Sequence, residues 1–201
     1  MSTADMDTIF DGLHVIDADT HISEPHDLWT ANAPSATRAR LPQVKEIDGA
    51  NHWIVDGDID LGAATPVSVV RSDGQKSDGI EFFGWSQEDV HVASYDMKAR
   101  VRLMDELGIG AQVIYPNVAG FGNQNFMQIE DESLRLACAT VYNDAMVEIQ
   151  RGSDDRIFPM ALVPWWNIEA CAAEIRRAHE LGLRGIVMCS DPDSVGLPDL
   201  G

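Results

Sequence analysis

The chain has 201 residues, 45% of them hydrophobic, so it can bury a sizeable core and is not expected to be disordered. A formal net charge of −19 at pH 7 argues against nucleic acid or an anionic membrane surface as its main partner. No apolar run reaches transmembrane length, and the acidic first twelve residues lack the apolar core of a signal peptide. Cys138, Cys171 and Cys189 show no CxxC spacing, which favours reduced thiols in a cytoplasmic protein.

The segment VIDADTHISEP, which begins at Val15 and ends at Pro25, is the most informative part of the sequence. A short apolar strand is predicted at residues 14–18, and it brings Asp19 and His21 to its exit. Alternate residues of an extended chain face the same way, so these two side chains can converge on one point. A carboxylate and a neutral imidazole are suitable ligands for a divalent transition metal. An isolated D-x-H would more often be a turn cap beside an ordinary loop histidine, but the following SEPHDLW favours the metal interpretation.

The next part of the chain departs from a simple strand and helix order. Pro25 is expected to open a short helix, HDLW, that ends before Pro34. Residues 35–90 are interpreted as an insertion near the mouth of the site. Within it, Asp56-Gly57 lies between alternating segments and predicts a tight hairpin, while the glycine-rich RSDGQKSDG predicts an exposed loop.

Beyond Asp96 the apolar residues alternate between helical spacing and short continuous runs. The expected elements are a helix from 96 ended by Gly108, a strand at 111–115, a helix at 134–149, a strand at 158–163, a helix capped by Asn167 and ended by Gly182, and a strand at 184–189. Strands that alternate with helices of this length predict an α/β fold with a parallel sheet and right-handed crossovers. Catalytic groups in such folds lie at the carboxyl ends of the strands, where Asp19 and His21 fall.

Loops on that same side contain further candidates for a substrate pocket. Asn117 follows the second predicted strand, and Trp165 and Trp166 follow the third. Aromatic side chains there can border a pocket, although they can equally well cover the rim of the sheet. None of the remaining histidines is expected to be a metal ligand; they are His14, His26, His52, His91 and His179.

Four segments, taken in order, resemble the amidohydrolase superfamily, in the branch related to aminocarboxymuconate-semialdehyde decarboxylase and often called amidohydrolase family 2. They are VIDADTHISEPHDLW, SYDMKARVRLMDELGIGAQVIYPN, LACATVYNDAMVEI and RIFPMALVPWWNIEACAAEIRRAHELGLRGIVM. The likeness extends from about residue 13 to residue 190, apart from the insertion. It implies a (β/α)8 barrel with a divalent metal, zinc or alternatively manganese, at its carboxyl face.

The resemblance also implies roles for individual residues. Asp19 and His21 would be the metal ligands of the first strand, and Glu24 belongs to the same motif as a candidate pocket residue beside Asn117 and Trp165. The remaining ligands of the family, a histidine of the fifth strand and an aspartate of the eighth, have no counterpart in these 201 residues. A complete barrel takes about 250 residues. We therefore expect one partial domain, residues 1–201, with about four βα units that form the N-terminal half of a barrel, as a fragment or truncated product.

The implied function is that of a metal-dependent hydrolase, in which a metal-activated water attacks an amide, ester or lactone-type bond of a small-molecule substrate. The first alternative is a non-oxidative decarboxylase of an aromatic or unsaturated carboxylic acid. A third hypothesis belongs to another class: an inactive half-barrel that serves as an interaction module. A half-barrel sheet has two open edges, so pairing into a homo-oligomer is a further expectation.

Overall fold

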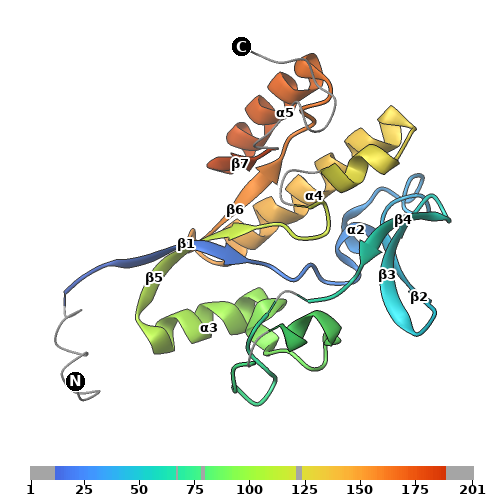
Figure 1. Ribbon diagram of the computed structural model, residues 1–201. Coiled ribbons are helices and arrows are strands. Elements are labelled where there is room, and N and C mark those ends of the chain that lie inside the picture. Colours follow the sequence, from blue (N-terminus) through green and yellow to red (C-terminus); the bar gives the residue numbers. More distant parts are fainter. Residues whose placement is uncertain (1–11, 67, 78–79, 121–123, 189–201) are drawn as a thin grey trace, which may run out of the picture.

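The computed structural model describes residues 12–66, 68–77, 80–120 and 124–188 (Figure 1). Its main sheet has four strands in the order β1-β5-β6-β7, and each neighbouring pair is parallel. The strands are β1 (Val15–His21), β5 (Ile109–Tyr115), β6 (Ile157–Leu162) and β7 (Gly185–Val187). A separate antiparallel sheet of three strands follows β1. The fold class is therefore the predicted one, α/β with a parallel half-barrel sheet and a hairpin-containing insertion after the first strand.

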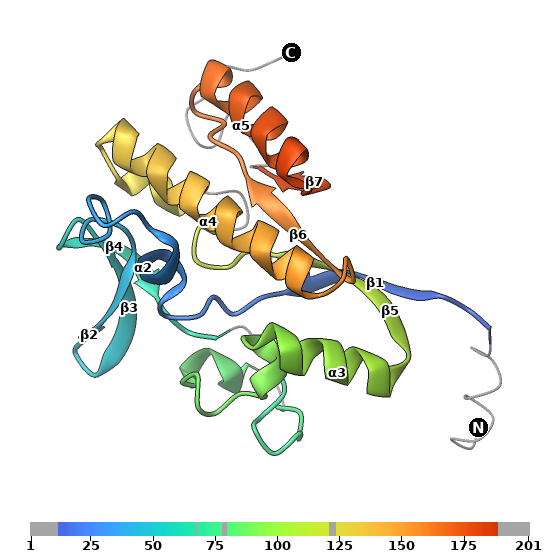
Figure 2. The same cartoon turned by 180° about the vertical axis from the view of Figure 1, so that it is seen from behind.

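Three long helices connect the strands of the main sheet. They are α3 (Met97–Leu107), α4 (Glu132–Gly152) and α5 (Ile168–Leu181). The predicted cap of α5 is confirmed, because the Asn167 side chain accepts a backbone hydrogen bond at the start of the helix. The Asp96 side chain does the same at the start of α3. Gly108 and Gly182 end the same two helices in the left-handed conformation, which a glycine adopts without strain. Seen from behind, α4 packs along β6 (Figure 2).

Several predicted boundaries need correction. The first strand does not stop at residue 18 but continues through His21, because β5 supplies backbone partners as far as Tyr115. The helix predicted as HDLW is α2 (Leu28–Asn32), two residues later, after a turn at Pro25. The last strand is shorter than the predicted 184–189, and Cys189 at its predicted end lies outside the described residues.

The insertion contains β2 (Gln43–Ile47), β3 (Ala50–Val55) and β4 (Ile59–Ala63), with the short 3-10 helices η1 (Glu81–Gly84) and η2 (Val92–Ser94) after them. A further 3-10 helix, η3 (Gln124–Gln128), follows β5. Asp56 and Gly57 both have positive φ between β3 and β4, which confirms the predicted hairpin. A second Asp-Gly pair, Asp48 and Gly49, also has positive φ and forms the turn between β2 and β3; this turn was not predicted.

The insertion shares the main hydrophobic core and is not an appendage. Trp53 of β3 packs edge-on against Trp29 of α2, with ring centroids 5.3 Å apart. The Trp29 indole N–H in turn donates to the carbonyl of Cys138 in α4, at 2.9 Å. Both indoles are buried, so α2, β3 and α4 form one packed unit beside the sheet. None of the described helices combines the length and the apolar composition that crossing a membrane requires.

Candidate functional site

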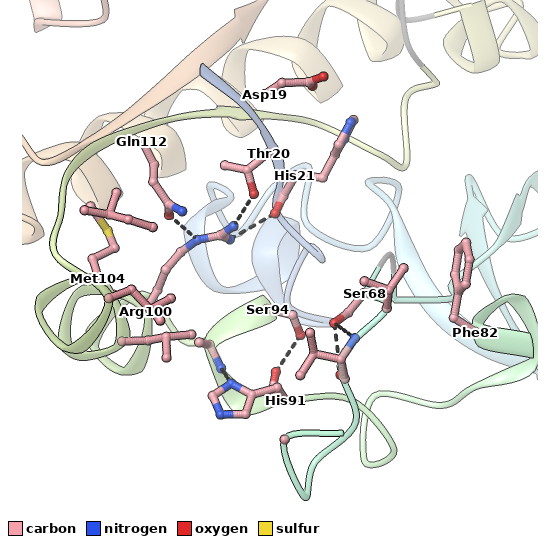
Figure 3. A pocket seen from close by; sticks show the side chains of 17 residues that line it. Asp19, Thr20, His21, Ser68, Phe82, His91, Ser94, Arg100, Met104 and Gln112 are labelled. Carbon is pink, nitrogen blue, oxygen red and sulfur yellow. Dashed lines mark hydrogen bonds between the residues drawn. The ribbon is translucent and has the colours of Figure 1, made fainter. Parts of the chain in front are cut away.

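Asp19 and His21 lie at the carboxyl end of β1, inside the last three residues of the strand. Their side chains leave the strand on the same side, whereas Thr20 between them points the opposite way, towards α3 (Figure 3). Asp19 is exposed and His21 is half-buried. The His21 ring lies 5.9 Å from the ring of Tyr115 on β5, at a tilt of 43°. The structure thus places the two predicted metal ligands on one side of β1, as period-two alternation requires.

A β-bulge sets this orientation. Asp17 is paired with Gln112 and Thr20 with Ile114, so three steps along β1 match two along β5. Because of the extra residue, Asp17 and Thr20 both reach hydrogen-bond partners on the α3 side of the sheet. Asp19 and His21, which alternation keeps on one side, consequently both lie on the face opposite Asp17 and Thr20. The bulge could not be deduced from the sequence of β1 alone.

A cavity of about 620 Å³ lies on the α3 side of β1, and the residues that line it include Asp19, Thr20 and His21 at the end of the strand (Figure 3). One wall is α3, through Arg100 and Met104, and the opposite wall is the second half of the insertion. This wall includes Ser68 and Phe82 of the insertion and His91 directly after it. Most of the cavity surface is apolar, although polar residues such as Ser68, His91 and Arg100 also line it. It is therefore suited to a small molecule with an apolar body that reaches the end of β1.

Glu24 is buried three residues beyond His21, and its carboxylate holds two loops together. Its Oε1 accepts hydrogen bonds from the backbone N–H groups of Asn117, at 2.7 Å, and Val118, at 3.3 Å. Burial raises the pKa of Glu24 to about 7, although these hydrogen bonds act in the opposite direction. The Asn117 side chain donates to the carbonyl of Ile22, so both residues join the loop after β1 to the loop after β5.

The predicted pocket residues are thus placed differently. Glu24 borders a second, smaller cavity with His26 and Trp53, away from α3. Trp165 is buried and packs edge-on against Trp166, with centroids 5.5 Å apart. Within the described part of the chain, neither Trp165 nor Asn117 borders the 620 Å³ cavity. A role for these residues in binding substrate remains a prediction.

Carboxylate oxygen and imidazole nitrogen are donors that zinc and manganese accept, so the chemistry of Asp19 and His21 fits a divalent metal. Their number is insufficient, because firm sites use three or four protein ligands. In the described part of the chain, no three His, Cys, Asp or Glu side chains gather closely enough to hold an ion. The pair therefore fits part of a metal site.

Arg100 and Gln112 are polar residues of the cavity that the sequence did not single out. Both are buried, and the Arg100 guanidinium donates to Gln112 Oε1 at 2.8 Å. A signal was present in the sequence, because Arg100 falls three residues after Met97 and four before Met104. A charged residue within the apolar stripe of a helix indicates a buried polar contact.

Comparison with known proteins yields a likeness of fold. No protein-family model and no curated protein sequence matches the chain. Among solved structures, a crystal structure of an amidohydrolase from Mycobacterium avium subsp. paratuberculosis K-10 is similar, with a TM-score of 0.61 and 18% sequence identity. The match covers 86% of this chain and 48% of that one, so the chain spans about half the length of the amidohydrolase. At this identity the likeness shows the fold alone.

Proposed function

We propose that this chain carries part of the active site of a metal-dependent hydrolase of the amidohydrolase type. The observation that supports the proposal is the shared orientation of Asp19 and His21 at the carboxyl end of β1 (Figure 3). Active sites of barrels built from parallel strands lie at that end. The similarity in fold to half of an amidohydrolase adds independent support.

Asp19 and His21 would hold a divalent ion, with zinc as the first choice and manganese as the alternative. Such an ion supplies Lewis-acid chemistry, because it polarises a carbonyl and acidifies water. Protein donors beyond this pair would have to come from outside the described residues. The bond proposed for cleavage is an amide, ester or lactone.

Metal binding provides the first test of the proposal. Purified wild type, Asp19→Asn and His21→Ala are dialysed against zinc or manganese, and bound metal is measured by mass spectrometry. We expect each substitution to weaken binding by at least about 10- to 100-fold, the loss seen when even a residue behind a ligand is removed, because either one removes half of the visible donors. His52→Ala is the matched control, since His52 also lies beside a carboxylate, 2.9 Å from Asp60 in the insertion. Unchanged metal content in both site variants would refute the ligand assignment.

The reaction is tested separately on protein loaded with the metal that binds. Hydrolysis of a panel of esters, amides and lactones is compared with release of CO2 from aromatic and unsaturated carboxylic acids. The proposal predicts cleavage of at least one panel member, lost in Asp19→Asn. CO2 release without hydrolysis would replace the hydrolase with a decarboxylase. Metal binding with neither activity would favour the non-catalytic interaction module.

A further inference from the structure

Arg100 of α3 reaches the carboxyl end of β1 from the face opposite Asp19 and His21 (Figure 3). Its side chain makes three hydrogen bonds, and two of them end on β1. Nη1 donates to the backbone carbonyl of His21 at 2.9 Å, and Nη2 donates to Thr20 Oγ1 at 2.8 Å. The guanidinium therefore holds both the side chain of Thr20, which lies between the two candidate ligands, and the backbone of His21.

The third bond orients the guanidinium. Nε of Arg100 donates to Gln112 Oε1 at 2.8 Å, and Gln112 Nε2 donates to Asp17 Oδ2 at 3.0 Å. These contacts form one continuous network, Asp17–Gln112–Arg100–Thr20, beneath the bulge in β1. A planar fork with fixed donor directions is what such a network requires, and a lysine cannot reproduce it.

Burial of Arg100 is costly, which indicates that the contact has a purpose beyond packing. The residue is 7% exposed, and no carboxylate of the described residues lies within ion-pair distance of it. The carboxylate of Asp17 is connected to Arg100 only indirectly, by the hydrogen bonds that each of them makes with Gln112. An apolar side chain would satisfy the stripe between Met97 and Met104 without desolvating a charge. What the arginine adds is a fixed geometry for residues 20 and 21.

We propose that Arg100 is a positioning residue, which fixes the bulged end of β1 so that Asp19 and His21 present their donors to one point. The proposal rests on the function proposed above, because it assigns Arg100 a role towards the same metal site. Removing a residue that holds a metal ligand in place, without itself touching the metal, lowers metal affinity about 10- to 100-fold. The expected signature is therefore a weaker site in a chain that is still folded.

The main comparison is Arg100→Met against Arg156→Met. Arg156 is a matched control because it also donates to backbone carbonyls of a strand. Those carbonyls are at the start of β5, far along the sheet from the carboxyl end of β1. Its Nη2 donates to Ile109 at 2.7 Å and its Nε to Gly110 at 3.0 Å. Affinity for Co²⁺ is titrated by its visible absorbance, and the imidazole signals of His21 are followed by NMR in metal-free protein. Arg100→Met should weaken Co²⁺ binding about 10- to 100-fold and move the His21 signals, whereas Arg156→Met should change affinity less than about twofold. Arg100→Lys should not restore wild-type affinity.

A milder variant decides the question if Arg100→Met does not fold. Thr20→Val removes a single hydroxyl from the network and keeps the shape and strand preference of the side chain. It should weaken Co²⁺ binding about threefold and shift the His21 signals in the same direction as Arg100→Met.

The two proposals fail in different ways. If wild type does not bind Co²⁺, the proposed function is refuted for this chain, and the metal-free His21 signals still test the positioning role. If wild type binds Co²⁺ and a folded Arg100→Met, or Thr20→Val in its place, binds it equally well with unmoved His21 signals, the positioning role is refuted. In that case the metal site itself stands.

Discussion

The carboxyl group of Glu24 gives the structure a pH dependence that one substitution should remove. The side chain is buried, and its Oε1 accepts hydrogen bonds from the backbone of the loop after β5. Burial raises its pKa from 4.5 to about 7. The buried hydroxyl of Tyr142 faces the same region, and its own pKa is raised by burial and by the charge of Glu24. Glu24→Gln keeps an oxygen that can accept the same backbone bonds but cannot ionise.

The folded state binds the Glu24 proton more tightly than the unfolded state, which fixes the sign of the effect. Below about pH 4.5 both states are protonated, and the stabilising contribution is fully present. It is lost as the pH rises through about 7, because the folded protein must then hold a buried charge. A difference between pKa values of 4.5 and about 7 corresponds to about 3 kcal/mol. The stability of Glu24→Gln relative to wild type should therefore increase by about 3 kcal/mol between pH 4.5 and pH 8.

Urea unfolding followed by tryptophan fluorescence measures this difference at fixed ionic strength. The substitution also removes one negative charge from an acidic protein, so Glu106→Gln, an exposed position of α3, corrects for that change. A relative stability of Glu24→Gln that stays constant to within about 1 kcal/mol over this pH range would refute the burial argument.

Two further substitutions test the packing around the sheet. Asn143→Leu should lower the free energy of unfolding by about 3 kcal/mol, because it removes three buried hydrogen bonds. The Asn143 side chain accepts from the N–H of Leu162 and donates to its carbonyl, both at 2.8 Å, and it also donates to Glu174. A loss below about 1 kcal/mol in urea unfolding would contradict this prediction. Asp96→Ala should cost about 1 kcal/mol by removing the cap of α3, whose side chain accepts from Ala99 N–H at 2.8 Å. Asp96→Asn, measured by thermal unfolding, should retain most of that stability, and equal losses in both variants would argue against a capping role.

Local signals in the sequence were sufficient to predict the order of the strands of the main sheet and of the helices that connect them. Asp96 and Gly108 bound α3 as expected, because a cap acts through bonds within a few residues of itself. Asp56-Gly57 likewise forms its hairpin through backbone conformations that these residues favour. Asp48-Gly49 carries the same signal and forms a second hairpin that was not predicted.

Features that depend on distant parts of the chain could not be predicted. The end of β1 extends to His21 because Thr20 and His21 pair with β5, and the sequence DTH does not by itself favour a strand. The bulge depends on partners of Asp17 and Thr20 in β5 and α3. The contact between Glu24 and Asn117 arises where two loops meet, 93 residues apart. Residue pattern therefore identified the candidate ligands, but the contacts that orient them required the tertiary structure.

Anomalous X-ray scattering at the zinc edge, from crystals soaked in zinc, shows directly whether Asp19 and His21 bind a metal. We expect a peak about 2.0–2.2 Å from one carboxylate oxygen of Asp19 and one ring nitrogen of His21. A peak bound elsewhere, for example at His52 and Asp60, with the Asp19 and His21 side chains turned away from each other, would contradict it.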